Sequence, residues 1–191
     1  MTRGDRPTDL AQTGVAPESA AIVVTDIAGS MGFSVRFGDL ATRQVIHRFF
    51  TMAEQLVQIY GGRTVKLLGD DGAMILFTET EQAFAFATAL QRSLVENPIV
   101  AGDEPMRVRV SLHAGSIRVR QTSYGEDAFG VDIDIAARLN SLAQPGEIVV
   151  SATAAGALSE ERRRILGPPE RVILKGHLAP IEVNRVDVQQ L

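Results

Sequence analysis

Two acidic turns hold the residues of this chain whose types and spacing could do chemistry. In the first, Asp26 follows an apolar run over residues 20–24 and precedes a glycine-containing turn. In the second, Asp70 stands in a Gly-Asp-Asp-Gly turn between two apolar runs, with Lys66 four residues before it. Glycine and aspartate tolerate the backbone angles of a tight reversal, so the second turn predicts a hairpin. Two aspartates at strand ends predict a two-carboxylate Mg²⁺ site that serves a triphosphate.

The composition argues against several other kinds of site. The 191 residues carry a net charge of -4 and include no cysteine and three histidines. These values disfavour a nucleic-acid partner, a disulfide framework and a thiolate or His-rich metal site. No apolar run reaches the roughly 20 residues that a membrane-spanning helix needs, and the N-terminus has no signal-like apolar stretch. We therefore expect a cytoplasmic protein with no nucleic-acid partner and no membrane span.

A folded domain must position these candidate site residues, and a chain of 191 residues is long enough to form one. Residues 1–19 are polar and are expected to form a flexible tail, so the domain is expected over 20–191. Helical spacing of apolar residues predicts helices over 40–60, 81–95 and 129–143, and a short helix near 152–158. Apolar and alternating runs predict strands over 20–24, 65–77 with its hairpin turn, 106–113, 116–120, 147–150, 171–174 and 181–186. A turn is expected at Ala114-Gly115 and a loop over 121–128.

The resulting order β-α-β-β-α-β is typical of a ferredoxin-like α+β fold. In such a fold we expect the helices to pack on one face of a mainly antiparallel sheet. His113 is expected to be a structural strand residue, Asp71 a plain turn residue, and Arg118 and Arg120 residues of exposed faces.

Six segments of the chain resemble the class III nucleotidyl cyclase catalytic domain, also called the cyclase homology domain. Each segment alone is a weak signal, but all six follow the family order from about residue 20 to residue 186. They are Thr25-Asp26-Ile27-Ala28-Gly29-Ser30, Lys66-x-x-Gly69-Asp70, residues 108–115, Asp127-x-x-Gly130-x-x-x-Asp134-x-x-x-Arg138, residues 145–151, and Leu174-Lys175-Gly176.

The resemblance implies a metal and phosphate site. Asp26 and Asp70 match the family's metal carboxylates, which hold two divalent ions per site, Mg²⁺ or Mn²⁺. The ions serve the in-line attack of the ribose 3′-oxygen on the α-phosphorus. The turn with Gly29 and Ser30 would offer backbone N–H groups to the phosphates, and Lys175 matches the family's polyphosphate lysine.

The same resemblance implies recognition of adenine. Lys66 can donate to ring nitrogen N1, and Asp127 can accept from the exocyclic amine, which guanine lacks there. Arg138 matches the arginine that stabilises charge on the phosphoryl group in the transition state. The family usually has asparagine four residues before this arginine. Here Asp134 replaces a donor with an acceptor and adds a negative charge beside a triphosphate.

We therefore expect an adenylyl cyclase that converts ATP to 3′,5′-cyclic AMP and pyrophosphate as a homodimer. In the family, one protomer supplies the metal pair and the other supplies the base-reading and transition-state residues. Asp134 leaves open a degenerate domain, weakly active or inactive, that acts as a nucleotide-binding or regulatory module. A guanylyl cyclase is a second alternative, which Lys66 and Asp127 disfavour.

Overall fold

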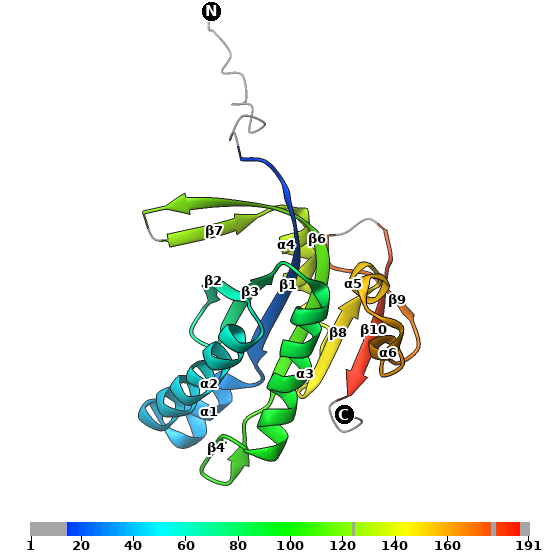
Figure 1. Ribbon diagram of the computed structural model, residues 1–191. Helices are drawn as coiled ribbons and strands as arrows, with labels where there is room; N and C mark the ends of the chain where they lie inside the picture. The colour runs from blue at the N-terminus through cyan, green and yellow to red at the C-terminus, as the bar shows by residue number, and fades with distance from the viewer. Residues whose placement is uncertain (1–14, 124, 177–178, 188–191) are drawn as a thin grey trace, which may run out of the picture.

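The computed structural model describes residues 15–123, 125–176 and 179–187. Helices and strands are interspersed along the chain (Figure 1). In chain order they are β1 (Glu18–Ile27), α1 (Ser30–Phe37), α2 (Asp39–Ile59), β2 (Arg63–Leu68), β3 (Gly72–Phe77), α3 (Thr80–Glu96), β4 (Val100–Ala101), β5 (Glu104–Pro105), β6 (Val108–Thr122), β7 (Gly125–Phe129), α4 (Val131–Asn140), β8 (Glu147–Ser151), α5 (Ala152–Ala157), α6 (Glu160–Arg163), β9 (Glu170–Val172) and β10 (Ile181–Asp187).

One sheet of eight strands runs through the described part of the chain (Figure 1). Its order is β2-β3-β1-β6-β8-β10-β9, and β7 pairs with β6 outside this path. All of the pairs are antiparallel except β6 with β8, which is parallel. The mainly antiparallel α+β fold is therefore confirmed. The central position of β1 places its C-terminal end, with Asp26, between the β2–β3 hairpin and β6.

Helices cover both faces of this sheet, so the expectation of a single covered face was wrong. On one face, Ala21 and Val23 of β1 pack in a core with residues of α2, α3 and α5. On the other face, Ile22 and Val24 pack in a second core with Ala136 of α4. Since every position from 20 to 24 is apolar, the run itself is typical of a strand that is buried on both sides. The helix α4 therefore lies on the face opposite to α2 and α3.

The strand β6 corrects two further expectations. It runs through Ala114 and Gly115 without a turn and pairs with β1 from Val108 to Ile117. A loop was expected over 121–128, but residues 121–122 of β6 pair with residues of β7, which begins at 125. Close packing rather than a turn explains the glycine at position 115, because a Cβ atom there would collide with the side chain of Asp132.

The helices expected over 40–60, 81–95 and 152–158 are confirmed within one or two residues as α2, α3 and α5. The third expected helix is shorter than 129–143, because Phe129 completes β7 and α4 ends at Asn140. The apolar spacing did not predict α1, α6, β4 or β5. Of the expected tail, residues 1–14 lie outside the described residues, and β1 begins at Glu18. Within the described ranges, no helix has the length and apolar character to cross a membrane.

Candidate active site

Strand pairing brings the two acidic turns side by side. Asp26 lies opposite Gly72, the first residue of β3, and the amide of Ile27 donates to the carbonyl of Asp71 at 3.0 Å. The turn between β2 and β3 therefore abuts the end of β1, and the hairpin prediction is confirmed. We call Asp26, Asp70 and Asp71 the acidic group. Its members come from the ends of neighbouring strands, so backbone hydrogen bonds set their separation.

Arg109 contacts the acidic group, and sequence reasoning did not single it out. It lies opposite Asp26 across the β1–β6 pair. Its Nε atom donates to Oδ2 of Asp26 at 2.9 Å, and its Nη2 atom donates to the same oxygen. These bonds leave Oδ1 of Asp26 available as a ligand. In the sequence, Arg109 is simply a polar residue in the alternating run of β6. This pattern does not indicate that its partner is Asp26.

The donor set of the acidic group fits a divalent cation that also binds phosphate. Carboxylate oxygens are hard ligands, and Mg²⁺ is commonly held by one or two carboxylates together with substrate phosphates and water. Among the described residues, no cluster of three or more His, Cys, Asp or Glu side chains could hold a metal ion. Oδ1 of Asp26 and the carboxylate of Asp70 would thus supply the protein ligands, and a substrate would complete the shell.

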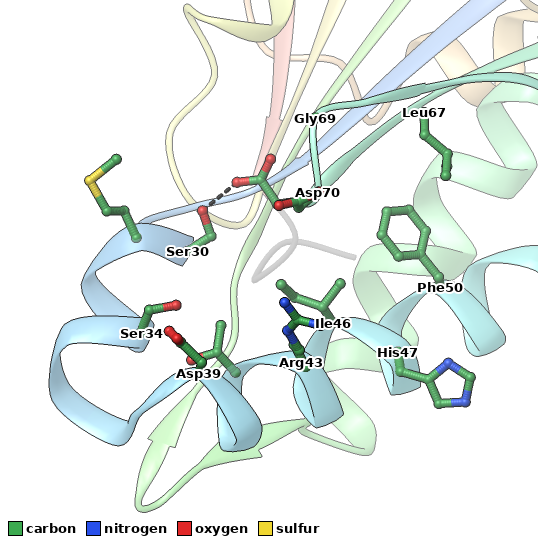
Figure 2. A pocket seen from close by; sticks show the side chains of 13 residues that line it. Ser30, Ser34, Asp39, Arg43, Ile46, His47, Phe50, Leu67, Gly69 and Asp70 are labelled. Atoms are coloured by element: carbon green, nitrogen blue, oxygen red, sulfur yellow. Dashed lines mark hydrogen bonds between the residues drawn. The ribbon is translucent and has the colours of Figure 1, made fainter.

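The chain turns from β1 into α1 beside these acids. Gly29 adopts a positive φ of 74°, which a residue with a side chain rarely adopts, and α1 begins at Ser30. The amides of Ile27 and Ala28 donate to main-chain carbonyls, so the amides left for a phosphate are those of the first turn of α1. The hydroxyl of Ser30 donates to a carboxylate oxygen of Asp71 (Figure 2). Asp71 therefore ties α1 to the hairpin and is more than a turn residue.

A cleft of about 740 Å³ opens between α1, α2 and the β2–β3 turn (Figure 2). Asp70 and Asp71 border it on the hairpin side, and Arg43 and His47 of α2 border it on the other. Its full lining is Ser30, Met31, Ser34, Asp39, Thr42, Arg43, Ile46, His47, Phe50, Leu67, Gly69, Asp70 and Asp71. Of the acidic group, Asp70 and Asp71 line the cleft and Asp26 does not. Lys66, Asp127 and Arg138 are not part of the lining either, so within one chain the cleft contacts the hairpin acids but none of these three residues.

Lys66 of β2 and Asp127 of β7 meet because β7 lies beside β2 (Figure 1). The Nζ atom of Lys66 lies 3.6 Å from Oδ1 of Asp127. A neighbouring pair ties the same two strands, since Nε of Arg63 donates to Oε1 of Glu126 at 3.2 Å. Arg120 of β6 donates to Oδ2 of Asp127 at 3.1 Å. The structure therefore brings together the two residues that sequence analysis expects to read the base.

The helix α4 carries the remaining expected site residues. A guanidinium nitrogen of Arg138 donates to the carbonyl of Lys175, so the expected arginine and lysine are neighbours. Leu174, beside this lysine, is buried against Leu139 of α4. Asp134 lies exposed in the first turn of α4. We call Lys66, Asp127, Asp134, Arg138 and Lys175 the mixed-charge group.

A network around the buried His113 holds the start of α4 on the sheet. Nε2 of His113 lies 2.9 Å from Oδ1 of Asp132, and its Nδ1 lies 2.9 Å from Oγ of Ser151. The second carboxylate oxygen of Asp132 accepts from the amide of Ser116 at 2.7 Å. His113 is thus a structural strand residue, as expected. The network fixes the turn of the helix that carries Asp134.

Comparison with known proteins identifies the nearest family. Residues 15–183 match the family model of the adenylate and guanylate cyclase catalytic domain. An adenylate cyclase of Glutamicibacter nicotianae is 28% identical over 171 residues, which cover 88% of this chain and 40% of that protein. An adenylate cyclase of Streptomyces coelicolor is 30% identical over 143 residues, which cover 74% of this chain and 35% of that protein. The chain thus spans about two fifths or less of the length of these two relatives.

Solved structures show the same fold. The guanylyl cyclase Cya2 superposes with a TM-score of 0.82 at 19% identity, over 90% of this chain and 93% of that chain. The adenylyl cyclase CyaB from P. aeruginosa superposes with a TM-score of 0.76 at 16% identity, over 90% and 95% of the two chains. The chain therefore shares the overall fold of these two proteins.

Proposed function

This chain belongs to the adenylate and guanylate cyclase catalytic domain family, and we propose that within it the chain is an adenylyl cyclase. The reaction would convert ATP to 3′,5′-cyclic AMP and pyrophosphate. The observation that carries this choice of base is the approach of Lys66 to Asp127 at 3.6 Å. A donor beside an acceptor matches N1 and the exocyclic amine of adenine, whereas guanine offers an N1–H donor and a carbonyl oxygen at the same edge.

The residues of the acidic group would hold the metal ions. Asp26 and Asp70 would bind two Mg²⁺ or Mn²⁺ ions, which when bound acidify the ribose 3′-hydroxyl and neutralise the triphosphate. Arg109 would orient Asp26 by holding Oδ2, which leaves Oδ1 to bind a metal ion. The first turn of α1, beginning at Ser30, would donate amide hydrogens to phosphate oxygens.

The residues of the mixed-charge group would bind the rest of the nucleotide. Arg138 would donate to the phosphoryl oxygens as charge develops on them, because a guanidinium offers several donors in a fixed plane. Its present partner is a main-chain carbonyl, that of Lys175, which substrate can replace without breaking an ion pair. The ammonium group of Lys175 would contact the terminal phosphates.

We further propose that the site forms between two copies of the chain. The cleft is bordered by Asp70 and Asp71 but not by Lys66, Asp127 or Arg138, which supports two separate half-sites in each chain. Exposed apolar side chains flank both: Met31 and Val35 of α1 are 82% and 83% exposed beside the acidic group, and Val131 at the start of α4 is 70% exposed. A symmetric dimer would bury such residues and place the acidic group of one copy against the mixed-charge group of the other.

Asp134 supports one alternative, a weakly active or inactive domain that binds nucleotide for regulation. Its carboxylate is exposed at the start of α4, and among the described residues it has no hydrogen-bond or ion-pair partner that would neutralise it. An acceptor at this position cannot donate to the ribose, and its charge opposes that of the triphosphate.

Product analysis tests the proposal directly. The purified chain is incubated with ATP or with GTP, in the presence of Mn²⁺ or Mg²⁺, and cyclic AMP and cyclic GMP are quantified separately. We expect metal-dependent cyclic AMP formation that exceeds cyclic GMP formation. Faster cyclic GMP formation would show a guanylyl cyclase instead. Nucleotide binding without either product would favour the regulatory alternative. A Thr88→Ala variant on α3, away from both groups, serves as the matched active control.

A further inference from the structure

Arg120 contacts the base-reading pair, although its position on an exposed strand predicted a plain surface residue. It lies directly opposite Asp127 in the β6–β7 hairpin, and its Nη2 atom donates to Oδ2 of that residue at 3.1 Å. Its guanidinium carbon lies 5.3 Å from the centre of the Phe129 ring, within cation–π distance. Strand register and the aromatic ring together therefore hold the guanidinium in place beside the carboxylate.

The two oxygens of Asp127 have different surroundings. Oδ2 accepts the hydrogen bond from Arg120, whereas Oδ1 faces Lys66 at 3.6 Å, which is longer than a hydrogen bond. An ionised carboxylate has about four lone-pair positions, so Oδ1 can still accept from another donor. The ammonium group of Lys66 likewise has donors left for a ligand. The pair is thus close enough to act on one base, but its members do not saturate each other.

We propose that Arg120 is a positioning residue that sets the preference for adenine. By holding Oδ2, it turns Oδ1 toward the place where the exocyclic amine of adenine would bind, and it keeps Asp127 from closing onto Lys66. Guanine presents a carbonyl oxygen at that edge, which a fixed carboxylate oxygen repels. This inference rests on the proposed cyclase function, and it adds a specificity-determining contact from β6 that the six motifs do not contain.

Loss of Arg120 should therefore act on nucleotide selection rather than on the chemical step. In the Arg120→Gln variant, Asp127 can rotate and shorten its 3.6 Å ion pair with Lys66 to a hydrogen bond, which withdraws both from the base. Because the Arg120 side chain is about half exposed, the effect should match that of one solvent-exposed ion pair. We expect the KM for ATP to rise about threefold, kcat to change less than twofold, and the ATP to GTP preference to fall by about the same threefold.

Three further variants separate positioning from simple support of the hairpin. Arg120→Lys keeps a donor and should restore part of the preference. Phe129→Leu removes the ring that holds the guanidinium, so it should shift the preference in the same direction but add nothing in the Arg120→Gln background. Arg118→Gln is the matched control, since Arg118 lies on the same strand and donates to the carbonyl of Val15 instead. It should leave the preference unchanged.

The experiment measures kcat and KM for both nucleotides, and in parallel the affinity of each variant for ATP and for GTP by calorimetry. The affinity measurement reports on base selection even in a chain that forms no cyclic nucleotide, so a failure of the proposed function is distinguishable from a failure of this inference. An equal loss for both nucleotides, or a fall in kcat with unchanged KM, would overturn the positioning role. A larger loss for GTP would also overturn it, because Arg120 would then read the guanine carbonyl itself.

Discussion

The acidic group and the mixed-charge group are assembled in different ways. Asp26, Asp70 and Asp71 lie at the ends of paired strands, so the register of β1 with β3 and β6 places them. The mixed-charge group depends on elements that do not pair: β7 over β2, and α4 against the segment around Lys175. Backbone pairing sets the spacing of the acidic group, which the side-chain contacts of Arg109 and Ser30 then orient. Side-chain contacts join the separate elements of the mixed-charge group. The acidic group should therefore tolerate little change, whereas the mixed-charge group can be tuned by substitution.

The surroundings of two glycines illustrate this difference. A Cβ atom at Gly72, beside the acidic group, would lie 2.9 Å from the main-chain oxygen of Thr25, which cannot move without disturbing β1. A Cβ atom at Gly115, beneath α4, would instead meet the side chain of Asp132. Backbone crowds the first site and a side chain crowds the second. We therefore expect substitutions at Gly72 to be tolerated less well than substitutions at Gly115.

The largest effect is expected from the acidic group. Asp26→Ala or Asp70→Ala should abolish metal-dependent cyclic AMP formation, because each change removes one of the two proposed metal ligands. Asp71→Ala should reduce the rate much less, because Asp71 is not a proposed metal ligand and its carboxylate accepts a hydrogen bond from Ser30. Rates are measured with Mn²⁺ and Mg²⁺, and Mn²⁺ binding by electron paramagnetic resonance. A near wild-type rate in either of the first two variants would remove that residue from the metal site.

Mixing two inactive variants tests whether the two groups act across a dimer. Asp26→Ala lacks a working acidic group, and Arg138→Ala lacks a working mixed-charge group. If subunits exchange freely, half of the dimers are mixed and each has one intact site of two, so activity should recover to roughly a quarter of the wild-type value. Exchange is verified with differently tagged chains. Absence of recovery in demonstrably mixed dimers would mean that each site is built within one chain.

The same contrast explains how much of the molecule the sequence predicts. Asp26 and Asp70 stand at the ends of apolar runs beside turn residues, so local pattern alone suggests a two-carboxylate site. The contact of Arg109 with Asp26 depends on strand register between distant segments, which no local pattern encodes. Gly115 reads locally as a turn, yet it lies inside β6, because the requirement for glycine comes from Asp132 on another element.

Base recognition is harder still to predict from residues alone. The polar segment over 121–128 has no apolar alternation, so the sequence does not predict that β7 pairs with β6. Without this pairing, the contact of Arg120 with Asp127 cannot be expected. The resemblance to a family linked Lys66 with Asp127, whereas composition and spacing did not. Both faces of β1 are apolar, a pattern that predicts burial of both faces but does not show that α4 covers the second one.

Base preference should respond to a double change in the mixed-charge group. Lys66→Glu with Asp127→Gly removes the donor for adenine N1 and the acceptor for its amine, and the new carboxylate can accept from guanine N1–H and N2–H₂. We expect the ratio of ATP to GTP use to fall about tenfold or more, since hydrogen bonds to charged groups are involved. The ratio of kcat/KM values measures this. An unchanged ratio in a folded, active variant would exclude both residues from base recognition.

The smallest effect is expected at Asp134. Asp134→Asn exchanges an exposed carboxylate at the start of α4 for an amide that can donate to the ribose, and it removes a negative charge from the neighbourhood of the triphosphate. A donor oriented in a buried transition state is worth about 10²-fold. Asp134 is exposed to water, which weakens charge interactions, so we expect a rise of several-fold in kcat with little change in KM.

Steady-state kinetics with ATP measure this change in kcat. The contrasting variant is Asp132→Asn, which alters the adjacent network around His113. A fall in kcat for Asp134→Asn would show that the carboxylate itself works in the site, as a ribose or metal contact, and that the mixed-charge group is already suited to its substrate.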